Sequence, residues 1–227
     1  MKIAGFKKQS LIDYPGNISS VVFTQGCNFR CGFCHNPNLV LPEKFEAVYD
    51  EEEIFDYLTK YSKLLNAVCI TGGEPTMHKD LPLFITKIKE LGLKIKLDSN
   101  GTNPDMLQYL FKNNLIDSIA MDIKHILEFK EYNNAVGNFI TKETFLKVLN
   151  SIDLIKSSKI DYEFRTTVAK GLHNKKHIRI LQKQFGVNYQ IHNFNPEIVL
   201  DPNLNIKPFS ESEYKELVDF QTSTSLT

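Results

Sequence analysis

The sequence predicts an α/β fold in which six strand-and-helix units form a partial (β/α)6 parallel barrel, an open relative of the eight-stranded β/α barrel. Short apolar, β-rich runs alternate with segments of helical periodicity along the chain, a pattern typical of βαβ units and a parallel sheet. The chain has 227 residues, which suffice for one substantial core. We expect a single domain over residues 1–227, with its core at about 18–192 and a C-terminal extension with a short helix at about 193–227.

Six strands are expected, each of them short and rich in apolar residues. They cover residues 18–24, 67–71, 93–97, 118–121, 162–168 and 187–191. Parallel strands that are covered on both faces have nearly continuous apolar runs of this kind.

The helices between these strands have apolar residues at three- and four-residue spacing and recognisable ends. Asp50 precedes three glutamates, which suit the positive end of a helix, and Asn103 is a cap residue followed by Pro104 at the first helical position. A helix from Asp80 has Gly92 as its stop. Further helices are expected near 145–155, after a polar stretch at 125–137, near 178–186, and from residue 210 on.

The composition is that of an ordinary soluble globular protein. The 27 basic residues balance the 27 acidic ones, so the average charge provides no basic surface for nucleic acid or anionic membranes. No apolar run approaches the roughly 20 residues of a membrane-spanning helix, and residues 1–8 lack the apolar stretch of a signal peptide. A cytoplasmic protein is therefore expected.

Three of the four cysteines form the pattern Cys27-x3-Cys31-x2-Cys34. Such clustering is a poor disulfide framework for a domain of this size and more often indicates metal or redox chemistry. Three thiolates in one loop suit a 4Fe–4S cluster with one iron left open, or a structural zinc site that includes His35. The fourth, Cys69, lies inside an apolar strand and is expected in the core.

Polar or special residues follow the predicted strands, at the end where β/α barrels place their active sites. The first strand runs into the cysteine loop, and later strands run into residues 72–75 (GGEP), 98–101 (DSNG) and 122–124 (DIK), with Arg165 in the fifth strand and His192 after the sixth. Each alone has a plainer explanation, namely a turn, a solvated ion pair or a structural histidine. An arginine inside a barrel is costly without a partner, so Arg165 is expected to meet a carboxylate of a ligand or of the protein.

The pattern CxxxCxxC followed by GGEP resembles the signature of the radical S-adenosylmethionine (SAM) superfamily. Residues 10–16 (SLIDYPG), 23–28 (FTQGCN) and 34–37 (CHNP) are similar to the activating enzymes of glycyl radical enzymes. Within that family they most resemble the activating proteins of anaerobic ribonucleoside-triphosphate reductase. The resemblance implies the superfamily's partial barrel. It also implies an enzyme that reductively cleaves SAM to a 5′-deoxyadenosyl radical and generates a glycyl radical on a partner enzyme, expected to be that reductase.

The resemblance also implies roles for individual residues. Cys27, Cys31 and Cys34 would bind three irons of the cluster while SAM chelates the fourth, and no side chain is assigned a catalytic role beyond the cluster and SAM. Several positions match the family's cofactor-binding segments: Phe33 at the adenine of SAM, His35 beside the third cysteine, and Gly72, Gly73 and Glu74 at the methionine amino group. Asp98, Ser99 and Asn100 lie in a segment like the family's DTNG, and Asp122 and Lys124 match positions near the ribose and carboxylate of SAM. Arg165 and His192 are the last two cofactor-binding candidates, and for His192 a structural role is an alternative.

A flavodoxin- or ferredoxin-type electron donor and anaerobic conditions are implied as well, with no nucleic-acid or membrane partner. The alternatives are a small-molecule radical SAM enzyme similar to 7-carboxy-7-deazaguanine synthase and a non-catalytic zinc-binding module. Pyruvate formate-lyase activators carry an arginine shortly after the PG, where this chain has residues 17–19 (NIS), so that target is disfavoured. Residues 36–66 contain no cysteine, so no auxiliary cluster is expected.

Overall fold

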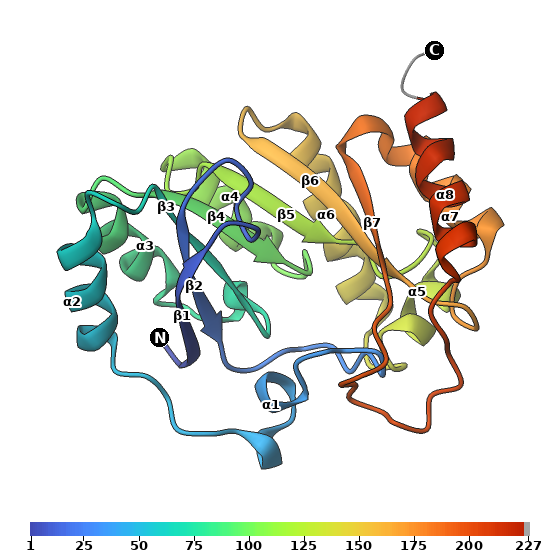
Figure 1. Cartoon of the computed structure of the whole chain (residues 1–227), viewed down its shortest axis with the longest axis horizontal. Helices are drawn as coiled ribbons and strands as arrows, with labels where there is room; N and C mark the ends of the chain where they lie inside the picture. Colours follow the sequence, from blue (N-terminus) through green and yellow to red (C-terminus); the bar gives the residue numbers. More distant parts are fainter. Residues whose placement is uncertain (225–227) are drawn as a thin grey trace. The chain divides into compact units, whose positions relative to one another are not determined.

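The structure, a computed structural model, describes residues 1–224 and the side chains as far as residue 220 (Figure 1). Its strands are β1 (Ile3–Ser10), β2 (Ser19–Thr24), β3 (Ala67–Gly72), β4 (Lys94–Ser99), β5 (Ser118–Asp122), β6 (Asp161–Val168) and β7 (Tyr189–Asn193). Its α-helices are α1 (Pro37–Val40), α2 (Glu51–Tyr61), α3 (Leu81–Glu90), α4 (Pro104–Lys112), α5 (Phe129–Ala135), α6 (Lys142–Ser157), α7 (Lys175–Phe185) and α8 (Glu211–Thr224).

The strands are hydrogen-bonded in the order β1 to β7. Strand β2 pairs in parallel with β3, β3 with β4, and β6 with β7. The register between β2 and β3 places Thr24 opposite Gly72, so the two strands end level with each other. The predicted α/β fold with a mainly parallel sheet is therefore confirmed.

Strand β1 was not expected from the sequence, and it pairs antiparallel to β2 at the edge of the sheet. Only Ile3 and Ser10 of its eight residues are buried, so it has no apolar run of the kind seen in the other strands. Lys7 and Lys8 lie in its exposed part, as is common in edge strands, which charged side chains protect from pairing with other chains.

Most helix ends lie where the sequence predicts them. Asp50 caps α2 by accepting a hydrogen bond from Glu52 N, and Asn103 caps α4 by accepting one from Met106 N at 3.2 Å. Two local predictions are wrong. The polar stretch 125–137 contains the short helix α5, which buries Tyr132 on its inner side. The last strand begins at residue 189 rather than 187, because residues 186–188 form a 3-10 turn.

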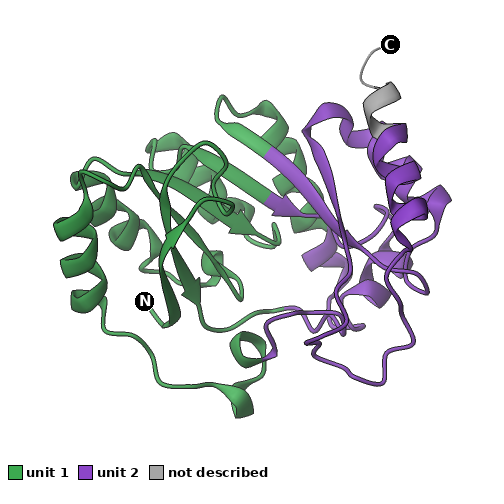
Figure 2. Cartoon of the chain, viewed as in Figure 1, with its two compact units in different colours: residues 1–28, 38–120, 146–162 green, residues 29–37, 121–145, 163–227 purple. Residues whose placement is uncertain are grey.

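The chain divides into two compact units (Figure 2). Unit 1 consists of residues 1–28, 38–120 and 146–162, and unit 2 of residues 29–37, 121–145 and 163–227. In unit 1 the core includes all of residues 67–70 of β3, which have no exposed surface. In unit 2 the rings of Phe164 and Phe185 pack 4.6 Å apart. The expectation of a single domain stays a prediction. Along the part of the chain that the structure describes, no helix is both long and apolar enough to traverse a membrane.

Candidate active site

The turn after β3 is bonded to the turn after β2 within unit 1. Gly73 N donates to Thr24 O at 2.9 Å, and Glu74 N donates to Gly26 O at 2.8 Å. A Cβ atom on Gly73 would lie only 1.9 Å from Gly26 O, so this approach of the two backbones requires glycine. The GGEP segment therefore fixes the backbone that leads directly into Cys27.

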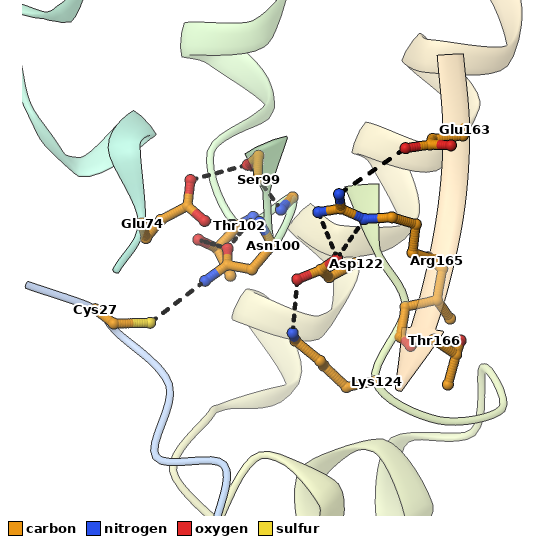
Figure 3. A network of polar contacts seen from close by, with 12 residues as sticks. Cys27, Glu74, Ser99, Asn100, Thr102, Asp122, Lys124, Glu163, Arg165 and Thr166 are labelled. Atoms are coloured by element: carbon orange, nitrogen blue, oxygen red, sulfur yellow. Dashed lines mark hydrogen bonds and ion pairs between the residues drawn. The ribbon is translucent and has the colours of Figure 1, made fainter. Parts of the chain in front are cut away.

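Glu74 is completely buried and ties the turn after β3 to the turn after β4 (Figure 3). Its Oε1 accepts hydrogen bonds from Thr76 N at 3.1 Å, from Thr76 Oγ1 at 2.5 Å and from Ser99 Oγ at 2.8 Å. Its Oε2 accepts one from Asn100 N at 2.6 Å. Burial raises the pKa of Glu74, and these hydrogen bonds counteract the rise without cancelling it. The role of Glu74 at the SAM amino group stays a prediction.

Asn100 connects the turn after β4 to the start of the cysteine loop (Figure 3). Its Nδ2 lies 2.8 Å from Asn28 Oδ1 and 3.9 Å from Cys27 Sγ. Its Oδ1 accepts from Thr102 Oγ1 at 2.7 Å, and that hydroxyl accepts from Asn28 Nδ2 at 2.8 Å. The sequence predicted Asn100 at the site but not Asn28 and Thr102, although these directly follow Cys27 and the DSNG segment.

Asp98, the first residue of the DSNG segment, forms an ion pair with Lys96 of the same strand at 3.4 Å. Lys96 is almost fully buried, and its Nζ also donates to Asp13 O at 2.8 Å. Ser10 Oγ donates to the Asp13 carboxylate. The DYPG segment is therefore held against β4 and the end of β1 by its own polar groups.

In unit 2, a charged cluster forms where β5 ends beside the middle of β6 (Figure 3). Asp122 Oδ1 accepts from Arg165 Nε at 3.1 Å and lies 3.0 Å from Arg165 Nη2, while Asp122 Oδ2 accepts from Lys124 Nζ at 2.9 Å. Burial alone would raise the pKa of Asp122, but the two cations outweigh it and hold that pKa below its usual range. Arg165 thus meets a carboxylate of the protein, as expected, and its contact with SAM stays a prediction.

Two buried histidines support the backbone of this cluster. His173 accepts at Nδ1 from Ala169 N at 3.3 Å, so its Nε2 carries the proton and donates to Lys124 O at 3.0 Å. The ring of His125 stacks on that of His173 at 4.9 Å. Burial, reinforced by His125, lowers the pKa of His173 to about 3. Sequence reasoning missed this support, although His125 directly follows the DIK segment.

The remaining predicted residues are either buried or exposed. Phe33 is buried, whereas His35 is exposed, with its ring 5.8 Å from that of Phe194. His192 lies in β7 opposite Thr167 and is exposed. Cys69 has no exposed surface in β3, which confirms its assignment to the core.

The sequence of the chain matches a family model across most of its length. The model describes the radical SAM superfamily, and it matches residues 21–206. The chain belongs to the radical SAM superfamily. Its expected α/β fold and its enzymatic nature are confirmed by that membership.

Two relatives narrow the family further. The chain is 34% identical over 223 residues to a protein of Methanocaldococcus jannaschii named for glycyl-radical enzyme activation, covering 95% of this chain and 89% of the relative. It is 24% identical over 197 residues to the pyruvate formate-lyase-activating enzyme of Clostridium pasteurianum, covering 79% of this chain and 81% of that enzyme. The chain is therefore a radical SAM enzyme of the family that activates glycyl radical enzymes.

Solved structures agree on the fold. Streptococcus suis SuiB bound to S-adenosylmethionine matches with a TM-score of 0.65 at 17% identity, covering 89% of this chain and 48% of SuiB. The superfamily uses a 4Fe–4S cluster together with SAM, and these are the cofactors of this enzyme.

The cysteine loop offers a donor set that fits such a cluster, because none of its three cysteines is part of a disulfide bond. The part of the loop that belongs to unit 2 turns tightly, because Cys34 N donates to Cys31 O at 3.0 Å. Asp201 N also donates to Gly32 O of this loop at 2.9 Å. Burial raises the pKa of the Cys34 thiol, while the Asn36 N–H and Lys124 oppose the rise. Thiolate sulfurs are the ligands that iron–sulfur clusters use.

Proposed function

We propose that this enzyme generates a glycyl radical on the anaerobic ribonucleoside-triphosphate reductase. The observation that carries the proposal is the SLIDYPG segment at residues 10–16, which continues as residues 17–19 (NIS) without the arginine of pyruvate formate-lyase activators. The near full-length similarity to a relative named for glycyl-radical enzyme activation supports it. A flavodoxin- or ferredoxin-type protein is the proposed electron donor.

In the proposed site, Cys27, Cys31 and Cys34 hold the cluster, and SAM contacts the cofactor-binding positions named from the resemblance. When bound, the cluster would supply one electron for the reductive cleavage of SAM, and this cleavage would supply the group that takes a hydrogen atom from a glycine Cα. The chain itself supplies position and charge. The backbone bonds of Gly73 and Glu74 hold the entry to the cysteine loop in place.

The charged cluster of unit 2 is proposed to bind the anionic end of SAM. Lys124 has three ammonium donors and gives one to Asp122. The His173 bond to Lys124 O fixes the backbone from which this side chain extends. Lys124 is therefore oriented before SAM arrives, and it can direct a remaining N–H toward the SAM carboxylate.

The test uses the reconstituted enzyme under anaerobic conditions, reduced and mixed with SAM and the reductase of the same organism. A glycyl doublet in the electron paramagnetic resonance spectrum that requires SAM would support the proposal. Cys31→Ala serves as the control, because it keeps the rest of the site and should give no doublet.

Pyruvate formate-lyase from the same organism is assayed in parallel. A doublet on that enzyme and none on the reductase would reject the proposed partner while keeping the reaction. SAM cleavage with no doublet on any glycyl radical enzyme of the organism would reject the reaction as well.

A further inference from the structure

The orientation of the Asn100 amide is fixed by its neighbours. Asn100 Oδ1 accepts from Thr102 N at 3.0 Å as well as from Thr102 Oγ1. A backbone N–H can only donate, so the oxygen of the amide must face Thr102. The NH2 group therefore faces Asn28 Oδ1. It also faces Cys27 Sγ, as Figure 3 shows.

The same amide is also held rigidly. Asn100 is 5% exposed, and its backbone N donates to the fully buried carboxylate of Glu74. Asn28 and Thr102 close a ring of hydrogen bonds around the amide, since Asn28 Nδ2 donates to Thr102 Oγ1. Rotation of the amide would break the bonds on both of its ends. An N–H that is aimed at sulfur and cannot turn away is a preorganised donor.

We propose that Asn100 donates a hydrogen bond to the Cys27 sulfur and thereby raises the reduction potential of the cluster. This inference rests on the proposed role of Cys27 as a cluster ligand. Reduction adds one electron, supplied by an external one-electron reductant, and increases the negative charge on the ligand sulfurs. A fixed N–H dipole beside one of those sulfurs stabilises the reduced form more than the oxidised form.

The N–S separation of 3.9 Å makes this a weak hydrogen bond, because sulfur is a diffuse and weak acceptor. Its effect on the potential is correspondingly modest. Removing the donor should lower the ratio of reduced to oxidised cluster at a fixed applied potential by about threefold, or about 30 mV at 59 mV per tenfold change for one electron. Glu74 acts only indirectly here, as the residue that positions Asn100.

The experiment is a redox titration of the reconstituted protein without SAM and without a partner, monitored by electron paramagnetic resonance. Asn100→Leu removes the donor and keeps the approximate size of the side chain. The matched control is Ser151→Ala, because buried Ser151 donates to Gly101 O at 2.7 Å. That change disturbs the same turn but leaves the amide in place. We expect a lower potential for Asn100→Leu and the wild-type potential for Ser151→Ala.

A wild-type potential in Asn100→Leu with full iron content would overturn the inference, and so would equal shifts in both variants. If Asn100→Leu does not retain iron, Asn100→Ala decides, because it removes the donor without adding a charge or bulk to the turn. A potential at or above that of the wild type, or loss of iron from this variant too, would show a purely structural role. None of these results depends on a glycyl radical, so they leave the proposed partner untouched.

Discussion

Replacing Gly73 with alanine should destabilise the protein and displace the start of the cysteine loop. The new Cβ would lie 1.9 Å from Gly26 O and 2.6 Å from Gly26 C. Carbon–oxygen contacts are favourable only from about 3.3 Å, so the backbones must separate by roughly 1.4 Å. That movement breaks the bond from Glu74 N to Gly26 O and weakens the bond from Gly73 N to Thr24 O.

The size of the effect follows from these contacts. Each backbone hydrogen bond contributes about 0.5–1.5 kcal/mol, and overpacking costs about 1–3 kcal/mol. The free energy of unfolding should therefore fall by roughly 2–5 kcal/mol. Gly92→Ala is the control, because Gly92 has a φ of +78° and no atom within 4 Å of an added Cβ. Left-handed backbone strain alone should cost this variant about 1–2 kcal/mol.

The assay is urea denaturation of the metal-free proteins, followed by circular dichroism, together with iron content after reconstitution. Gly73→Ala should unfold at a lower urea concentration than Gly92→Ala and should bind less iron, because Cys27 follows Gly26 directly. Equal urea midpoints for the two variants, or full iron content in Gly73→Ala, would show that the contact between Gly73 and Gly26 does not hold the cysteine loop in place.

Burial lowers the pKa of His173 to about 3. Below about pH 6.5 the unfolded chain therefore binds a proton at this histidine that the folded protein does not bind. The free energy of unfolding falls as the pH falls, because protons favour the unfolded chain. In urea titrations, the free energy of unfolding of the wild type should fall by about 2 kcal/mol more between pH 7 and pH 5 than that of His173→Gln. Equal decreases in the two proteins would contradict a buried, neutral His173 ring. Asp122→Asn should lower the free energy of unfolding by about 1–2 kcal/mol, because two partly exposed cations lose their carboxylate partner. The decrease should be smaller in molar salt, which screens ion pairs. A decrease that does not depend on salt would argue against these ion pairs. Cys69→Ala should keep full iron content, because Cys69 is buried in β3, and loss of iron would contradict its place in the core.

The sequence predicts those parts of the fold that depend on local signals. The helix after Asp50 and the helix after Asn103 begin as expected, because a side chain there accepts a hydrogen bond from the first turn. Strand β1 and helix α5 escape prediction because they bury few side chains. Their stability comes from pairing with β2 and from the packing of Tyr132 against the ring of Phe145 at 5.4 Å, contacts that no local pattern records.

In the site, too, the sequence indicates the residues with local signals but not the contacts between distant residues. Motif residues such as Glu74 are recognisable from their spacing, but their partners are distant in sequence. Asn28 and Thr102, for example, are 74 positions apart and bonded at 2.8 Å. The link from His173 to Lys124 O spans 49 positions. Only the pairing of strand ends brings such residues together, so neither composition nor periodicity indicates them.

The most direct test of the central claim follows the hydrogen atom. The partner reductase is produced with glycine that carries deuterium at Cα, and it is mixed anaerobically with the reduced enzyme and SAM. The 5′-deoxyadenosine product is then analysed by mass spectrometry, with unlabelled reductase as the control. We predict that deuterium enters 5′-deoxyadenosine only with the labelled reductase. Unlabelled 5′-deoxyadenosine formed alongside a glycyl radical on the labelled reductase would contradict it.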